Sequence, residues 1–158
     1  MRKCTMGLAA LVLAVLLAAP VFAHCEIPCG IYDDEMRIAM IAEHIDTIEK
    51  SMKQIVGLSQ SEGKSPNQLV RWVMNKEEHA KALQEIVTQY FMTQRVKTVS
   101  GDDRAAHRKY RNKLELLHRM LVHAMKAKQT TDLRQVEKLR DLLKKFRAVY
   151  FGEHGPRH

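Results

Sequence analysis

Residues 38–56 read IAMIAEHIDTIEKSMKQIV, and the spacing of their apolar side chains decides the fold. Apolar residues recur at alternating steps of three and four, at Ile38, Ile41, Ile45, Ile48, Met52 and Ile55. This spacing places all of these side chains on one face of an α-helix, while charged residues fill the other faces. The stretch therefore predicts a long amphipathic helix over residues 34–60.

Three further segments show the same period, over residues 66–98, 102–129 and 132–151. Ser65 and Pro66 supply a cap and a first-turn proline for the first of them. Short polar loops separate the segments, so we expect an all-α chain that forms an antiparallel four-helix bundle after an irregular N-terminal hook. The expected core positions are Leu69, Val73, Ala80, Leu83, Ile86, Val87, Tyr90 and Phe91, then Tyr110, Leu114, Leu117, Leu121 and Ala124, then Val136, Leu139, Leu143, Phe146 and Tyr150.

The composition agrees with a single helical domain. The chain has 158 residues, of which 46% are hydrophobic and only 6% aromatic, and its formal net charge is +8. Scarce aromatic residues favour helices over strands. The helix faces mix both signs of charge and contain neither a basic run nor an aromatic platform, so we expect no nucleic-acid partner.

The first 23 residues have the three regions of a secretory signal peptide. Arg2 and Lys3 are basic, residues 7–19 are apolar, and Val21-Phe22-Ala23 suits a signal peptidase. The apolar stretch is too short to span a bilayer, so no stable membrane anchor is expected. We therefore predict cleavage after Ala23, export to the periplasm or the extracellular space, and a mature domain over residues 24–158. His24 is too large to precede a lipidated cysteine, which argues against a lipoprotein.

The mature chain would begin with residues 24–32, HCEIPCGIY, and this segment offers unusual metal ligands. Cleavage frees the α-amine of His24, which loses its proton readily to a metal. That amine, the backbone amide nitrogen of Cys25 and the Cys25 sulfur can close two chelate rings on one ion. Pro28 and Gly30 tighten the chain so that the Cys29 thiolate can reach the fourth position. Two nitrogens and two sulfurs in a plane indicate nickel or copper rather than zinc, and the His24 imidazole is a candidate axial ligand.

Other interpretations of these residues stay open. Two cysteines in an exported chain ordinarily form a disulfide, so a structural protein with a Cys25–Cys29 bridge is one alternative. A non-catalytic periplasmic metal-binding or sensor helical bundle is another. The remaining histidines are expected to be solvated or hydrogen-bonded rather than ligands: His44, His79 and His107 are isolated, and His118 and His123 do not share a helix face.

The pattern His-Cys-x-x-Pro-Cys-Gly-x-Tyr at the start of a mature chain resembles the hook of the nickel superoxide dismutases. The matching positions are His24, Cys25, Pro28, Cys29, Gly30 and Tyr32. The resemblance implies one nickel ion per subunit, held by His24, Cys25 and Cys29, that alternates between Ni(II) and Ni(III) and converts superoxide to dioxygen and hydrogen peroxide. It also implies that Tyr32 and the Cys25 backbone face the substrate, and that the protomers form a homohexamer.

Some positions depart from that family. Glu26 stands where an aspartate is usual, and Ala39 or Met40 stands where some members carry a glutamate that supports the ligand histidine. The supporting arginine of some members has no assigned position in this sequence. Tyr90 is expected either beside the metal site or in the core. A positive net charge would speed the approach of an anion such as superoxide.

Overall fold

The computed structural model describes residues 28, 30–61, 63 and 65–152. The predicted cleavage site after Ala23 and the predicted ligands His24, Cys25 and Cys29 lie outside these residues. The chain divides into two compact units, Met1–Ile31 and Tyr32–His158, and every helix described below belongs to the second. No helix in the described part of the chain is long and apolar enough to cross a membrane.

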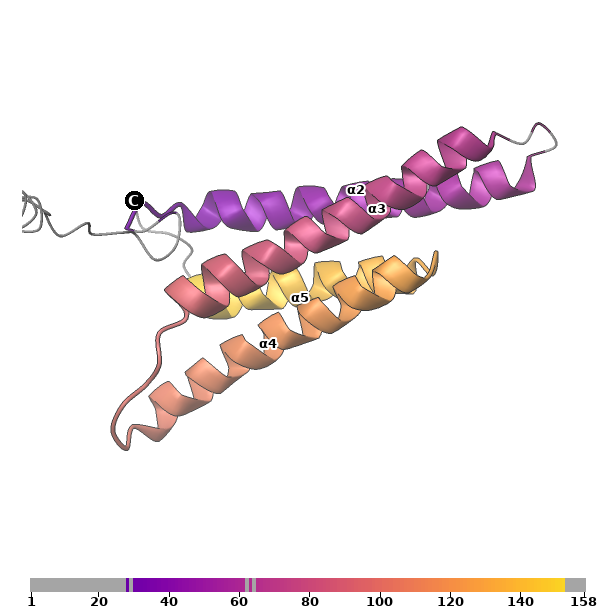
Figure 1. Ribbon diagram of the computed structural model, residues 1–158. Helices are drawn as coiled ribbons and strands as arrows, with labels where there is room; N and C mark the ends of the chain where they lie inside the picture. Colours follow the sequence, from indigo (N-terminus) through magenta and orange to yellow (C-terminus); the bar gives the residue numbers. More distant parts are fainter. Residues whose placement is uncertain (1–27, 29, 62, 64, 153–158) are drawn as a thin grey trace, which may run out of the picture. The chain divides into compact units, whose positions relative to one another are not determined.

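The second unit is built from two helical hairpins (Figure 1). Helix α2 (Asp34–Gln60) packs along α3 (Pro66–Glu85), and α4 (Arg104–Gln129) packs along α5 (Arg134–Phe151). The hairpins join through contacts of α3 with α4 and of α2 with α5, so each helix touches its neighbours in sequence. The residues that the structure describes contain helices and no strand, which confirms the predicted all-α four-helix bundle.

Aspartate side chains set the starts of three helices. Asp33 accepts a hydrogen bond from the Met36 amide at 2.8 Å, and Asp103 accepts from the Ala105 amide at 2.8 Å. Asp132 accepts from the Arg134 amide at 3.0 Å. Each carboxylate satisfies an amide that a helix start leaves without a partner. Because Asp103 and Asp132 act in this way before the helix, α4 and α5 begin at residues 104 and 134, two residues later than the sequence suggested.

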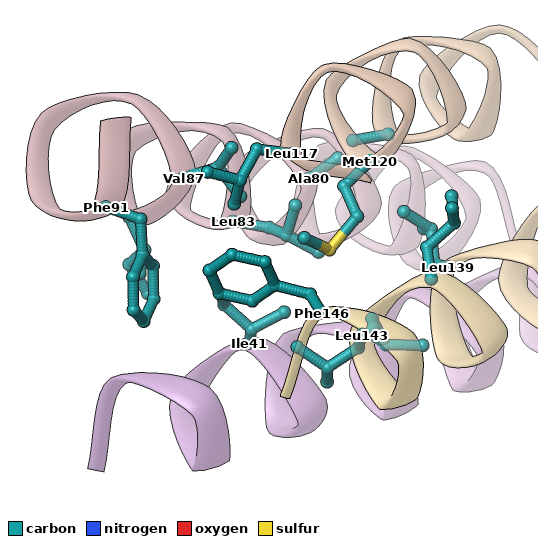
Figure 2. Close-up of a cluster of buried hydrophobic side chains, with 14 of the residues drawn as sticks. Ile41, Ala80, Leu83, Val87, Phe91, Leu117, Met120, Leu139, Leu143 and Phe146 are labelled. Carbon is teal, nitrogen blue, oxygen red and sulfur yellow. The ribbon is translucent and has the colours of Figure 1, made fainter. Parts of the chain in front are cut away.

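The core lies where the four helices meet. Figure 2 shows Ile41 of α2, Leu83 of α3, Leu117 of α4 and Phe146 of α5 directed toward one another, and all four are fully buried. The α2 stripe from Ile38 to Met52 is buried as predicted. The expected core position Val73 is wrong, because its side chain is 39% exposed. Figure 1 shows the reason: α2 and α3 extend past the α4–α5 loop, so nothing described covers that end.

Polar side chains of α3 fix its position against two neighbouring helices. The Asn75 amide donates to the Ser51 hydroxyl of α2 at 2.9 Å. The buried ammonium of Lys76 donates to the Ala127 carbonyl of α4 at 2.8 Å, and also to the Lys128 carbonyl. These carbonyls belong to the last turn of α4, where helix carbonyls lack internal partners and a cation is favourable. The contacts therefore fix the register of α3 at both interfaces.

The end of the second predicted helix differs from the expectation. The sequence predicted one α-helix over residues 66–98, but after Glu85 the chain continues as a π-helix, η1 (Ile86–Arg95), and then leaves helical structure. Bonds to carbonyls five residues earlier mark this segment, such as Val96 amide to Phe91 carbonyl at 2.8 Å. Residues five apart point about 140° away from each other in an α-helix. In η1 they lie much closer to one face.

Candidate active site

Of the predicted site residues, the structure describes only Tyr32; His24, Cys25 and Cys29 fall outside the described residues. In the first unit, a turn occurs beside those positions. The Ile31 amide donates to the Pro28 carbonyl at 2.7 Å, and Gly30 has a φ of +85°. A glycine takes this left-handed conformation without steric cost, which explains why a glycine occupies this position of the turn.

Tyr32 begins the second unit and is held by side chains of η1. Its ring meets the Tyr90 ring edge to face, with centroids 5.9 Å apart. The guanidinium carbon of Arg95 lies 4.1 Å from the Tyr32 ring centroid, within the range of a cation–π contact. The Tyr32 side chain is 37% exposed, so one side of it is held while the other reaches solvent.

Asp34, in the first turn of α2, is the centre of this cluster. Its Oδ1 accepts from the Tyr90 hydroxyl at 2.6 Å and from Arg95 Nε at 2.8 Å. Its Oδ2 accepts from Arg95 Nη2 at 2.7 Å and from the Tyr150 hydroxyl at 2.9 Å. One carboxylate thus joins three elements, α2, η1 and α5, and each of its oxygens receives two donors. The Asp34–Arg95 contact is bidentate, the strongest geometry for this pair.

These contacts shift the pKa values of the groups involved. Burial alone would raise the pKa of Asp34, but hydrogen bonds from Arg95, Tyr90 and Tyr150, with the charge of Arg95, lower it below its usual value. Burial first, and then the bond to the Asp34 carboxylate, raises the pKa of Tyr150 to about 12 and also raises the pKa of Tyr90. The Asp34 carboxylate raises the pKa of Arg95. At neutral pH the cluster therefore holds one anion, one cation and two neutral phenols.

Two more cations lie against the aromatic rings of this cluster. The Arg37 guanidinium carbon is 5.1 Å from the Tyr90 ring centroid, and Lys113 Nζ is 5.1 Å from the Tyr150 ring centroid. Burial, and then the nearby charge of Lys109, lowers the pKa of Lys113. Arg37 Nε is buried and lacks a hydrogen-bond partner within the described residues. Arg37 and Lys113 thus place two further positive charges beside the Asp34–Arg95 ion pair.

Comparison with known families decides what this arrangement belongs to. Residues 19–154 match the family model of nickel-containing superoxide dismutase. This chain belongs to that family. No curated protein and no solved structure matches it. As a nickel-containing superoxide dismutase it is an oxidoreductase that acts on superoxide and requires nickel. The matched range includes the segment 24–32 on which the sequence resemblance rests.

The described part of this dismutase adds residues that sequence reasoning did not find. Asp34, Arg95 and Tyr150 were not predicted as site residues, and Tyr90 was left between two roles. The structure gives Tyr90 both, since its ring is buried and its hydroxyl binds Asp34. An acidic residue in the first turn of a helix ordinarily stabilises the helix start, so nothing in the sequence marked Asp34 as a site residue. A helical period of 3.6 could not place Arg95 on the face of Tyr90.

The expectation that His44 and His79 are isolated is wrong. Their Nδ1 atoms lie 2.9 Å apart across the α2–α3 interface, and their ring centroids are 5.1 Å apart. Burial, and then the charge of His79, lowers the pKa of His44. The rings meet almost end to end, which suits one shared proton better than a metal ion placed between convergent lone pairs. Within the described residues no group of three or more histidine, cysteine or acidic side chains could hold a metal ion.

Proposed function

We propose that this dismutase is exported and binds its nickel through the N-terminus that cleavage after Ala23 creates. Two superoxide ions and two protons then give one dioxygen and one hydrogen peroxide, because one superoxide loses an electron and the other gains it. The support is the coincidence of a signal-peptide pattern, a histidine directly after its cleavage site and a family match that begins at residue 19 and includes that histidine. The periplasm or the extracellular space follows from the same pattern.

The proposed ligands are the α-amine and imidazole of His24, the backbone nitrogen of Cys25, and the thiolates of Cys25 and Cys29. Nickel held by these donors would supply the one-electron couple that the reaction needs. The donor set fits this ion, since a terminal amine and a backbone nitrogen beside two thiolates would suit nickel better than zinc. The turn from Pro28 to Ile31 supports the fit, because it reverses the chain beside Cys29.

The chain's own residues would handle the anion and the protons. Arg37 lies against the Tyr90 ring, and its positive charge would attract superoxide to this face. Tyr32 lies three residues after Cys29 and carries a half-exposed phenol, which we assign to ordering water and delivering protons to the reduced product. The free donor Arg37 Nε would bind an acceptor that the described residues do not provide. We also propose one nickel ion per subunit and a homohexamer, both on the strength of the family resemblance.

The proposal depends most on the histidine that follows the cleavage site, and this position can be tested directly. The full chain is produced with nickel in a bacterial host, and the secreted protein is analysed by mass spectrometry, metal analysis and a dismutase assay. We expect a chain that starts at His24, about one nickel per chain, and dismutation that Cys25→Ser and Cys29→Ser abolish. Native mass spectrometry of the same sample should give six subunits. A different first residue, or full activity without nickel, would disprove the proposal.

A further inference from the structure

We propose that Asp34 is a positioning residue of this dismutase: it holds the Arg95 guanidinium against the Tyr32 ring and so fixes the phenol that serves the reaction. The inference rests on the proposed role of Tyr32 at the substrate face. It adds a residue outside the segment 24–32, and the carboxylate of that residue acts only through its neighbours. Three observations carry it: the four hydrogen bonds that Asp34 accepts, the π-helix that presents two of its donor residues, and the cation–π contact of Arg95 with Tyr32.

Asp34 accepts more side-chain hydrogen bonds than a carboxylate at a helix start needs for stabilising the helix. Its two oxygens accept four hydrogen bonds, all between 2.6 and 2.9 Å, from Tyr90, Arg95 and Tyr150. The side chains of Asp34 and Arg95 are only 17% and 25% exposed. Capping of α2 belongs to the neighbouring Asp33, which accepts from the Met36 amide. The Asp34 carboxylate is therefore committed to side chains, and its geometry fixes theirs.

The π-helix makes this arrangement possible. Tyr90 and Arg95 are five residues apart, and the i to i+5 bonding of η1 turns both toward Asp34 Oδ1. A regular α-helix would direct Arg95 about 140° away from Tyr90. The backbone of this segment is irregular, but as a result two side chains donate hydrogen bonds to the same Asp34 oxygen. A π-helix at this place is consistent with the frequent use of such segments at functional sites.

Because Asp34 holds Arg95 in place, Arg95 in turn restricts the position of the Tyr32 ring. With Nε and Nη2 both bound to Asp34, the plane of the guanidinium is fixed, and its central carbon lies 4.1 Å from the Tyr32 ring centroid. Tyr90, fixed by the same carboxylate, contacts the Tyr32 ring from a second direction. Without Asp34 a long arginine side chain regains its rotamer freedom and the guanidinium moves into water. Tyr32 is 37% exposed and would then lose its only described cationic neighbour.

The test compares Asp34→Asn with Asp46→Asn in the nickel-loaded protein. Asp46 is a matched control, because it also lies on α2 and binds an arginine, Arg140 of α5, at 2.7 Å, yet it is 69% exposed. We expect Asp34→Asn to lower the dismutation rate by up to about a hundredfold, the scale of a group misplaced by about 1 Å, at unchanged nickel content and helicity. Asp46→Asn should leave the rate unchanged. Arg95→Lys keeps the charge but loses the planar bidentate contact, and should behave like Asp34→Asn.

A double-mutant cycle with Tyr32→Phe separates positioning from a structural role. If Asp34 acts through Tyr32, Asp34→Asn causes no further loss of rate in the Tyr32→Phe protein. An NMR readout is independent of turnover: the Tyr32 ring signal, assigned by its absence in Tyr32→Phe, should shift in Asp34→Asn and Arg95→Lys but not in Asp46→Asn. Equal losses in both backgrounds, or an unmoved Tyr32 signal, would overturn the inference. Both outcomes differ from failure of the proposed function, in which the unmodified nickel-loaded protein itself lacks activity.

Discussion

The two ends of the α2–α3 hairpin differ in how their side chains are covered. At the end that begins α2, the rings of Tyr90, Phe91, Phe146 and Tyr150 pack together, mostly edge to face, at centroid distances between 5.0 and 5.4 Å. Asp34 accepts hydrogen bonds from the hydroxyls of Tyr90 and Tyr150. At the loop end, the apolar side chains of Val70 and Met74 are 55% and 65% exposed. Figure 1 shows that α4 and α5 accompany the first end and stop short of the second.

This difference shows that the specific side-chain contacts of the hairpin gather at one of its ends. The apolar stripe alone makes a helix at both ends, but only the Asp34 end combines buried rings, a bonded carboxylate and an irregular helix. Three of the four tyrosines of the sequence, Tyr32, Tyr90 and Tyr150, gather there. The two ends should therefore respond very differently to substitution.

The largest effect is expected at Phe91, which is fully buried and contacts Tyr90, Phe146 and Tyr150. Phe91→Ala removes the centre of the ring cluster and leaves a cavity, so the free energy of unfolding should fall by about 3–5 kcal/mol. Denaturant unfolding followed by circular dichroism measures it. Phe91→Leu, which keeps much of the volume, should lose clearly less, and equal losses would mean that the site collapses freely.

A smaller loss is expected for Asp34→Asn. Removing the charge weakens the bidentate Arg95 contact and leaves a partly buried cation without its anion, so unfolding should become easier by about 2–3 kcal/mol. The same denaturant experiment on Asp46→Asn should show about 0.3 kcal/mol, because that pair is exposed and solvent screens it. Similar losses of unfolding free energy in the two variants would show that the half-buried Asp34 stabilises the fold no more than the exposed Asp46 does.

Acid should weaken the middle of the hairpin through His44. Its lowered pKa means that the folded chain keeps His44 neutral at a pH where the unfolded chain, with a pKa near 6.5, binds a proton. The unfolded state then holds more protons, so stability is full above pH 6.5 and falls as the pH drops below it, by at most about 1.4 kcal/mol per pH unit. Thermal unfolding between pH 7.5 and 5.5 tests this. His44→Gln should flatten the dependence in that window, and an unchanged slope would contradict the assignment.

The smallest effect is expected at the loop end. Val70→Thr replaces an exposed methyl by a hydroxyl of the same shape, so unfolding should change by less than about 0.5 kcal/mol. The measurement is again denaturant unfolding, at several protein concentrations. A loss above about 1 kcal/mol that grows with protein concentration would show instead that another subunit covers this end.

Much of this fold follows from side-chain periodicity, and the exceptions have physical causes. Ile41, Ile45 and Ile48 repeat with the helical period and are buried as expected. Val73 obeys the same period but lies on the overhanging end, and burial there depends on the length of other helices. The position of Arg95 beside Tyr90 was not predicted, because the π-helix η1 changes the angle between successive residues and no pattern in the sequence indicated a π-helix. The roles of residues 24–32 were predicted from ligand chemistry and a cleavage site, and Tyr32 is the one predicted site residue among them that the structure describes.

The most direct test of the nickel assignment uses two mature chains that differ by one residue. One begins at His24 and the other keeps Ala23, so that the His24 nitrogen becomes part of a peptide bond. Both are loaded with nickel, and their dismutation rates and electron paramagnetic resonance spectra after oxidation are compared. We expect turnover and a rhombic nickel(III) signal with nitrogen splitting for the first chain, and loss of both for the second. Equal rates and equal spectra for the two chains would contradict it.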